Sequence, residues 1–120
     1  MEKNIAIIDD EVTVLSLLKK FLERDGTYCV DVFSKPENAL ESISVKKYDL
    51  IMLDIMMPNI NGLEILKDLK SKSDIKVVIM TAHSTLNTTL RSETLGADGY
   101  VEKPFTSLLN LKAVIDEILS

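Results

Sequence analysis

The 120-residue sequence predicts an α/β fold in which parallel strands alternate with helices. Short continuous apolar runs recur along the chain, and runs of this length are typical of strands buried on both faces of a sheet. Segments with apolar residues at helical spacing fill the gaps between these runs. A strictly alternating order of this kind indicates a parallel sheet covered by helices on both faces.

Five runs are predicted to form the strands. Three of them, IAII at 5–8, LIML at 50–53 and VVIM at 77–80, are continuous and are expected to be fully buried. The run YCVDVF at 28–33 alternates less cleanly and is expected at an edge of the sheet. The fifth run, GYVEK at 99–103, is short.

Two of the five predicted helices carry a capping-box signature at their start. Ser34 with Glu37 is expected to open the second helix, and Asn61 with Glu64 the third. The first helix follows an apolar stripe and is expected to stop at Gly26. The last two helices are also marked by apolar spacing, and the fourth is rich in threonine, a poor helix former. We therefore expect the fourth helix to be the loosest.

Five strands and five helices fit the flavodoxin-like doubly wound (βα)5 form, with strand order 2-1-3-4-5. Residues 1–120 are expected to form a single domain. In folds of this type, ligands bind at the carboxyl ends of the strands, near the point where the strand order reverses.

Polar residues stand at these strand ends: Asp9, Asp10 and Glu11 after the first strand, Asp54 after the third, Thr81 after the fourth and Lys103 after the fifth. The strands concerned are neighbours in the predicted order, so their ends are expected to meet. Clustered carboxylates repel one another, and a hard divalent cation such as Mg²⁺ removes that repulsion. With Mg²⁺ and one lysine, three carboxylates form a neutral pocket that suits a phosphoryl group, with Asp54 as the nucleophile.

Each of these features also has a simpler interpretation. The pair Asp9–Asp10 would serve as a helix cap, and Asp54 as a turn residue. Thr81 and Lys103 would be ordinary surface side chains. These simpler interpretations do not explain why all of the residues converge on one edge of the sheet.

The composition narrows the functional classes. With 14 basic and 19 acidic residues the net charge is −5, which argues against nucleic-acid binding by this domain. Cys29 is the single cysteine, which excludes an internal disulfide and fits a reducing, cytoplasmic location. The N-terminal MEKNIAIIDD has only four consecutive apolar residues, so neither a secretory signal nor a membrane span is expected.

Two other functions are possible on this architecture. A flavin-binding electron carrier needs a phosphate cradle rich in serine, threonine and glycine after the first strand, where this chain has Asp9, Asp10 and Glu11. A dehalogenase-like phosphatase carries a second aspartate two residues after its nucleophile, where this chain has Met56. A yellow solution would support the first alternative, and turnover of a generic phosphate ester would support the second.

The sequence resembles the response-regulator receiver domains of bacterial two-component signalling. The matching pieces are Asp9-Asp10, the stretch DIMMPNING from Asp54 to Gly62, Thr81-Ala82 and Lys103-Pro104-Phe105. The resemblance covers the whole chain and implies a phosphorylation-activated signalling switch, not an enzyme acting on a separate substrate. It implies a phosphoryl donor that is the phosphohistidine of a histidine kinase or of a His phosphotransfer protein.

The resemblance also implies a role for each matching residue. Asp54 would be the phosphoacceptor. Mg²⁺ would be bound by Asp54, by Asp10 directly, by Asp9 mostly through water, and by the backbone carbonyl of Met56. Lys103 would pair with the phosphate, and the peptide bond that follows it, to proline, would be cis.

The resemblance further implies that Thr81 and Tyr100 carry the conformational readout. Because the fourth helix is rich in poor helix formers, we also expect phosphorylation of Asp54 to act on it through Thr81; the alternative is a marginal surface helix with no such role. An output domain or downstream protein is expected on the face between the fourth and fifth helices. The kinase is expected on the Val12, Leu15 and Lys19 side of the first helix and on the loop 103–106. The chain would be a stand-alone relay or the N-terminal receiver of a longer, transcriptional regulator.

Overall fold

The computed structural model describes residues 2–58, 60–82, 86–103, 105 and 107–120, with the backbone alone for 86–89. Its parallel sheet has the strand order β2-β1-β3-β4-β5, which confirms the predicted fold. The strands are β1 (Lys3–Ile8), β2 (Tyr28–Phe33), β3 (Leu50–Asp54), β4 (Lys76–Thr81) and β5 (Gly99–Glu102). The run at 28–33 lies at an edge, as expected.

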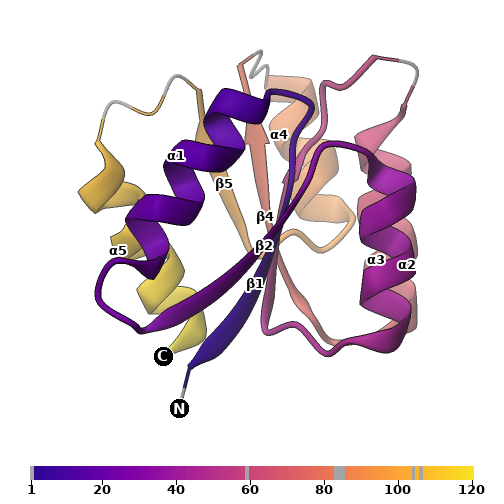
Figure 1. Cartoon of the computed structure of the whole chain (residues 1–120). Coiled ribbons are helices and arrows are strands. Elements are labelled where there is room, and N and C mark those ends of the chain that lie inside the picture. The colour runs from indigo at the N-terminus through magenta and orange to yellow at the C-terminus, as the bar shows by residue number, and fades with distance from the viewer. Residues whose placement is uncertain (1, 59, 83–85, 104, 106) are drawn as a thin grey trace.

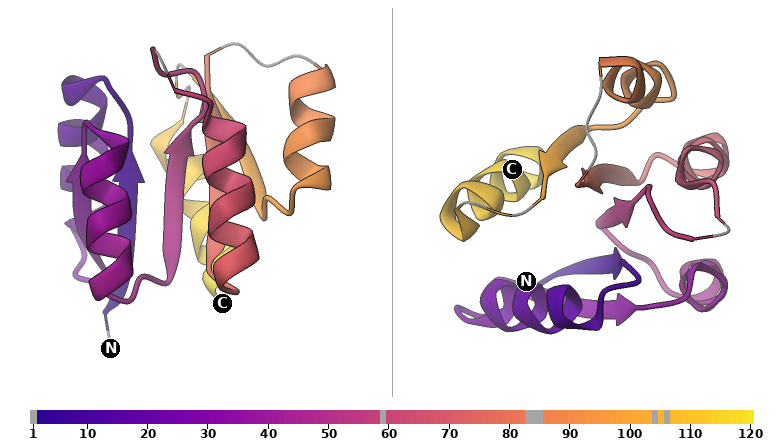
Figure 2. Two further views of the ribbon diagram at one scale, coloured as in Figure 1. Left: turned by 90° about the vertical axis from the view of Figure 1, so that its right-hand side faces the viewer. Right: turned by 90° about the horizontal axis from the view of Figure 1, so that it is seen from above.

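The helices are α1 (Val12–Glu23), α2 (Pro36–Val45), α3 (Gly62–Lys72), α4 (Leu86–Thr94) and α5 (Leu108–Leu119). Helices α1 and α5 cover one face of the sheet, and α2, α3 and α4 cover the other (Figures 1 and 2). Within the described residues, no helix is both long and apolar enough to cross a membrane. Helix α1 ends at Glu23, three residues before Gly26, the residue predicted to stop it. Gly26 has φ 77°, a conformation that favours glycine, and lies in the turn that leads to β2.

The sheet separates two apolar cores. Successive side chains of a strand point to opposite faces, so Ile7 packs with α1 and α5 whereas Ile8 packs with α2 and α3. This arrangement explains why the central strands read as continuous apolar runs. Strand β3 is buried along its whole length, and its last residue, Asp54, is only 3% exposed. The core therefore fixes the position of this carboxylate.

The two predicted capping boxes have different outcomes. Asn61 caps α3 as predicted, because its side chain accepts a hydrogen bond from the Leu63 N–H at 3.1 Å. Within the described residues, the Glu64 side chain makes no return hydrogen bond to Asn61, so the second half of the predicted capping box is not formed. The prediction that Ser34 caps α2 is wrong, because the N-cap residue is Lys35 and its side chain makes no capping hydrogen bond. Pro36 occupies the first turn, where its fixed φ favours a helix start and its missing N–H needs no partner.

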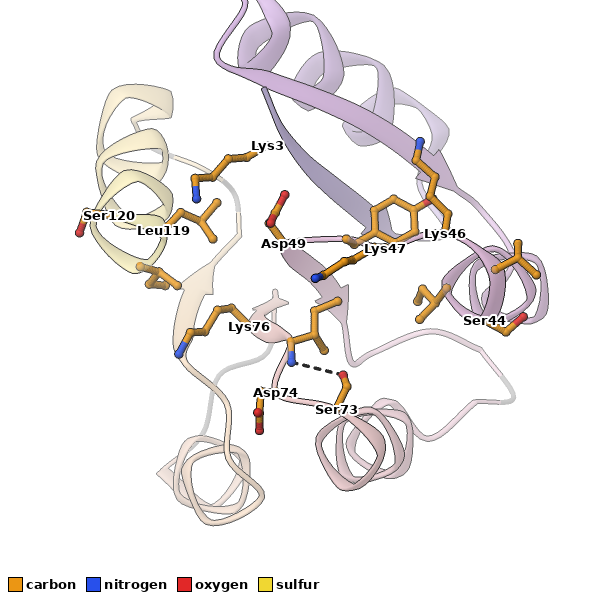
Figure 3. Close-up of a pocket in the computed structure, with 15 residues that line it drawn as sticks. Lys3, Ser44, Lys46, Lys47, Asp49, Ser73, Asp74, Lys76, Leu119 and Ser120 are labelled. Carbon is orange, nitrogen blue, oxygen red and sulfur yellow. Dashed lines mark hydrogen bonds between the residues drawn. The ribbon is translucent and has the colours of Figure 1, made fainter. Parts of the chain in front are cut away.

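A hollow of about 710 Å³ lies at the amino-terminal ends of the strands. Figure 3 shows Lys3, Asp49 and Lys76 around it, beside the C-terminal part of α5. The predicted phosphoacceptor and its neighbouring acids stand at the opposite ends of the strands. The hollow is therefore separate from the candidate site described below.

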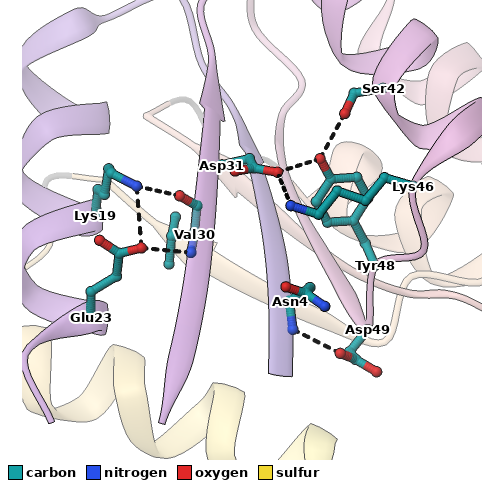
Figure 4. A network of polar contacts seen from close by, with 9 residues as sticks. All are labelled: Asn4, Lys19, Glu23, Val30, Asp31, Ser42, Lys46, Tyr48 and Asp49. Atoms are coloured by element: carbon teal, nitrogen blue, oxygen red, sulfur yellow. Dashed lines mark hydrogen bonds and ion pairs between the residues drawn. The ribbon is translucent and has the colours of Figure 1, made fainter. Parts of the chain in front are cut away.

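A polar network joins the C-terminal end of α2 to the sheet (Figure 4). Asp31 Oδ2 accepts hydrogen bonds from Lys46 Nζ at 2.7 Å and from the Tyr48 hydroxyl at 2.6 Å. The Tyr48 hydroxyl also lies 2.7 Å from the Ser42 hydroxyl. The hydrogen bond from Lys46, and after it the one from Tyr48, lowers the pKa of Asp31 below its usual value.

Replacing Asp31 with asparagine is expected to make the free energy of unfolding depend less on pH in the acid range. A carboxylate whose pKa is lowered by folding stabilises the fold above its unfolded pKa, and this contribution is lost as the pH falls through the folded pKa. Because Asp31 is partly exposed, we expect Asp31→Asn to lower the free energy of unfolding at pH 7 by about 1 kcal/mol or less. Urea denaturation between pH 3 and pH 7 measures both effects. Asp68→Asn, in an exposed pair with Lys72, is the control, and equal pH profiles for wild type and Asp31→Asn would contradict the prediction.

Candidate functional site

The carboxyl ends of β1, β3 and β5 bring Asp9, Asp54 and Lys103 together, as the sequence predicts. Lys103 Nζ lies 2.5 Å from Asp9 Oδ2 and 3.2 Å from Asp54 Oδ2. The three side chains are almost removed from water, with 7% of Lys103, none of Asp9 and 4% of Asp54 exposed. The backbone also holds the lysine, because its N–H donates to the Thr81 carbonyl at 2.8 Å.

Asp10 completes a group of three carboxylates. Oxygen atoms of Asp9, Asp10 and Asp54 lie within 4.8 Å of one another. Asp10 is exposed and the other two are buried, so the group is reached from solvent on one side. Asp54 Oδ1 accepts a hydrogen bond from the Met56 N–H at 2.9 Å, and Asp9 Oδ1 accepts one from the Glu11 N–H at 2.9 Å. These backbone contacts fix the orientation of both buried carboxylates.

Burial and charge shift the ionisation of two groups in this site. Burial raises the pKa of Asp9 because it disfavours the charged carboxylate; Lys103 acts in the opposite direction, and the charge of Asp54 adds to the rise. Burial alone would lower the pKa of Lys103, but hydrogen bonds to Asp9 and Glu11 and the charge of Asp54 raise it above its usual value. Lys103 is therefore cationic at neutral pH, and it balances one of the three negative charges.

The donor set fits a hard divalent cation. Within the described residues, the buried Asp9 Oδ2 has Lys103 Nζ as its close polar partner, in an ion pair. Carboxylate oxygens completed by water and a backbone carbonyl are ligands that suit Mg²⁺. Asp9, Asp10 and Asp54 therefore form a candidate site for such an ion.

The two predicted readout residues lie on neighbouring strands. Thr81 ends β4 and is fully buried, while Tyr100 lies on β5 and pairs in register with Ile79. The Tyr100 hydroxyl is buried, and no described residue hydrogen-bonds to it. The predicted cis peptide bond to Pro104 involves a residue outside those that the structure describes.

Glu11 has a role that the sequence analysis missed. It is the N-cap residue of α1, yet its side chain makes no capping hydrogen bond. Its Oε1 instead lies 3.1 Å from Lys103 Nζ. Glutamate is not among the preferred N-cap residues, and this mismatch is the signal in the sequence that points to another role.

The predicted kinase-docking side of α1 needs one correction. Val12 is 63% exposed, and 43% of the Lys19 side chain is exposed, as a docking surface requires. Leu15 is only 4% exposed and packs in the core with Leu18 and Leu22. It belongs to the apolar stripe that faces the sheet, so it is not available to a partner.

The fold and the site together define a class, the doubly wound α/β domains that carry a cluster of carboxylates and a lysine at the carboxyl edge of a parallel sheet. A family model described as the response regulator receiver domain matches residues 5–116. The chain belongs to this family. Receiver domains are signalling domains of two-component systems; they are phosphorylated on an aspartate and bind a divalent metal through acidic residues.

Known relatives agree with this assignment. The alkaline phosphatase synthesis transcriptional regulatory protein PhoP of Bacillus subtilis is 38% identical over 107 residues, which are 88% of this chain and 44% of that protein. The chain thus spans less than half of this relative's length. A two-component response regulator from Clostridium difficile superposes with a TM-score of 0.92 at 31% identity, covering 98% of this chain and 96% of that one.

A third relative carries the modification itself. A response regulator protein from Burkholderia pseudomallei was crystallised with a phosphorylated aspartic acid, a calcium ion and citrate. It superposes with a TM-score of 0.85 at 27% identity, covering 94% of this chain and 66% of that one.

Proposed function

We propose that residues 1–120 form one receiver domain in which Asp54 accepts a phosphoryl group in a Mg²⁺-dependent reaction. The observation that carries this proposal is the geometry around Asp54. Its buried carboxylate lies 3.2 Å from the Lys103 ammonium and within 4.8 Å of carboxylate oxygens of Asp9 and Asp10. The proposed donor is the phosphohistidine of a histidine kinase or of a His phosphotransfer protein.

The transfer is a displacement at phosphorus. An oxygen of Asp54 forms the new bond, the phosphorus–nitrogen bond of the phosphohistidine breaks, and the imidazole leaves with the electron pair and takes up a proton. Lys103 remains charged beside the carboxylate and stabilises the negative phosphoryl oxygens. A Mg²⁺ ion held by Asp9, Asp10, Asp54 and the carbonyl of Met56 would supply the remaining positive charge.

Thr81 and Tyr100 are proposed to transmit the change. Asp54 pairs in register with Met80, so Thr81 stands one residue further along the neighbouring strand. Its hydroxyl donates to a phosphoryl oxygen in the proposed active state, and Tyr100 packs behind it. The face between α4 and α5 then differs between the two states, and an output domain or downstream protein reads this difference.

The kinase or phosphotransfer protein is proposed to dock beside the cluster of Asp9, Asp10 and Asp54. Val12 offers exposed apolar surface at the start of α1, next to the loop that carries Asp9 and Asp10. An apolar patch beside a charged pocket suits a transient interface.

Intact-mass spectrometry tests the proposed function. After incubation with Mg²⁺ and acetyl phosphate, or with a phosphorylated histidine kinase, we expect the mass of one added phosphoryl group. The adduct should be labile, as acyl phosphates are, and should not form when a chelator removes the metal. Absence of any adduct with both donors, or an equal yield in the presence of chelator, would contradict the proposal.

A further inference from the structure

The contact between Glu11 and Lys103 joins residues that are 92 positions apart in the chain. Glu11 stands where a shorter polar side chain would cap α1, and its carboxylate is turned to the lysine instead. When a residue type is unfavourable for its local structure, as glutamate is at a helix N-cap, it is expected to have another function in the folded protein.

Lys103 Nζ has three donors and contacts three carboxylates, those of Asp9, Glu11 and Asp54. Two of these partners belong to the group of acids that fits a metal ion, and Glu11 does not. In the proposed reaction Asp54 becomes an acyl phosphate, so its carboxylate no longer offers Lys103 a negative charge. Glu11 is thus the one carboxylate contact of Lys103, among the described residues, that neither belongs to the proposed metal site nor receives the phosphoryl group.

We infer that Glu11 is a positioning residue, which holds the Lys103 ammonium beside the phosphoryl group by a hydrogen bond while Asp9 and Asp54 are engaged elsewhere. This inference rests on the proposed function of Asp54. A lysine side chain is flexible, and fixing it in advance avoids an ordering cost during transfer. Because 57% of the Glu11 side chain is exposed, its contribution is modest and does not extend to global stability.

Glu11 would act differently if only its negative charge mattered. The charge would repel an anionic phosphoryl donor, so every variant without the charge would be phosphorylated faster than wild type. Two variants separate the alternatives. Glu11→Gln removes the charge but keeps an oxygen acceptor at the same reach, whereas Glu11→Ala removes both.

The first experiment compares phosphorylation rates with acetyl phosphate and Mg²⁺. We expect Glu11→Ala to react about two- to five-fold more slowly than wild type, and Glu11→Gln to keep most of the wild-type rate. Glu102→Ala is the matched control, because Glu102 is an exposed acid next to Lys103 whose side chain has no hydrogen bond or ion pair within the described residues. Its rate should not fall. A rise in both Glu11 variants, or an equal loss in both, would overturn the inference.

The second experiment needs no phosphorylation. In a ¹H–¹⁵N spectrum recorded with Mg²⁺, the Lys103 ammonium should give a resolved signal, because bound partners slow exchange of its protons with water. We expect Glu11→Ala to lose this signal and Glu11→Gln to retain it, with melting temperatures close to that of wild type. An unchanged signal in Glu11→Ala overturns the inference, whereas a wild-type chain that takes no phosphoryl group overturns the function on which it rests.

Discussion

Replacing Asp54 with asparagine is expected to abolish the phosphoryl adduct that wild type forms with acetyl phosphate and Mg²⁺. The amide has almost the same shape as the carboxylate, but it is a neutral and very weak nucleophile. The substitution also removes one of the three negative charges that make the site fit a divalent ion. Intact-mass spectrometry under the conditions that label wild type measures the effect.

The fold of Asp54→Asn should persist, which makes a loss of labelling interpretable. Asp9 and Asp54 repel each other, and this repulsion contributes to the raised pKa of Asp9. Removing one of the two charges relieves it, so the melting temperature should not fall sharply. Asp68→Asn on the surface of α3 should label like wild type. A labile adduct of undiminished yield on Asp54→Asn would place the phosphoacceptor elsewhere.

Gly62→Ala is expected to reduce both stability and phosphorylation. A Cβ atom at Gly62 would lie 2.4 Å from Ile55 Cα and 2.8 Å from Ile55 Cβ, so the start of α3 must move away. Overpacking of this kind costs typically about 1–3 kcal/mol, and the backbone contact places Gly62→Ala at the upper end. Because Ile55 directly follows Asp54, the displacement also disturbs the phosphoacceptor. Urea denaturation and the rate of adduct formation measure the two effects.

Gly26→Ala provides the control for this substitution. Gly26 has φ 77°, so a side chain is strained there, at a cost of about 1–2 kcal/mol, but a Cβ would meet no atom within 4 Å. The position lies in the loop before β2, at the end of the sheet opposite to Asp54. Stability should therefore fall while the phosphorylation rate stays near that of wild type. Equal rates in Gly62→Ala and wild type would contradict the close approach of α3 to Ile55.

The strand order and the meeting of Asp9, Asp54 and Lys103 could be predicted because both follow from local pattern and topology. Runs such as 50–53 are buried on both faces, as is typical of a parallel sheet covered by helices on both sides. Once the strands are parallel, their last residues lie on one edge. The position of each acid directly after an apolar run is therefore sufficient to predict that it lies at the carboxyl edge of the sheet.

Contacts that depend on side-chain direction could not be predicted in this way. Ser34 has the residue type of a helix cap, but Pro36 two residues later determines where α2 starts. The reach of Glu11 to Lys103 joins two loops, and neither has a periodic pattern. The network of Asp31 likewise joins β2 to residues after α2, and only the folded chain shows that they meet.

Three acids on two strand ends, Asp9, Asp10 and Asp54, are proposed to share one divalent ion beside Lys103. Mn²⁺ accepts the same oxygen ligands as Mg²⁺, and its unpaired electrons broaden the NMR signals of nearby nuclei. On titrating Mn²⁺ into ¹⁵N-labelled protein, we expect the amide signals of Asp10, Asp54 and Met56 to disappear first. The signals of Asp49 and Asp74, beside the hollow at the opposite end of the sheet, should persist. Earlier loss of the latter two signals, or uniform broadening of the whole spectrum, would contradict this proposal.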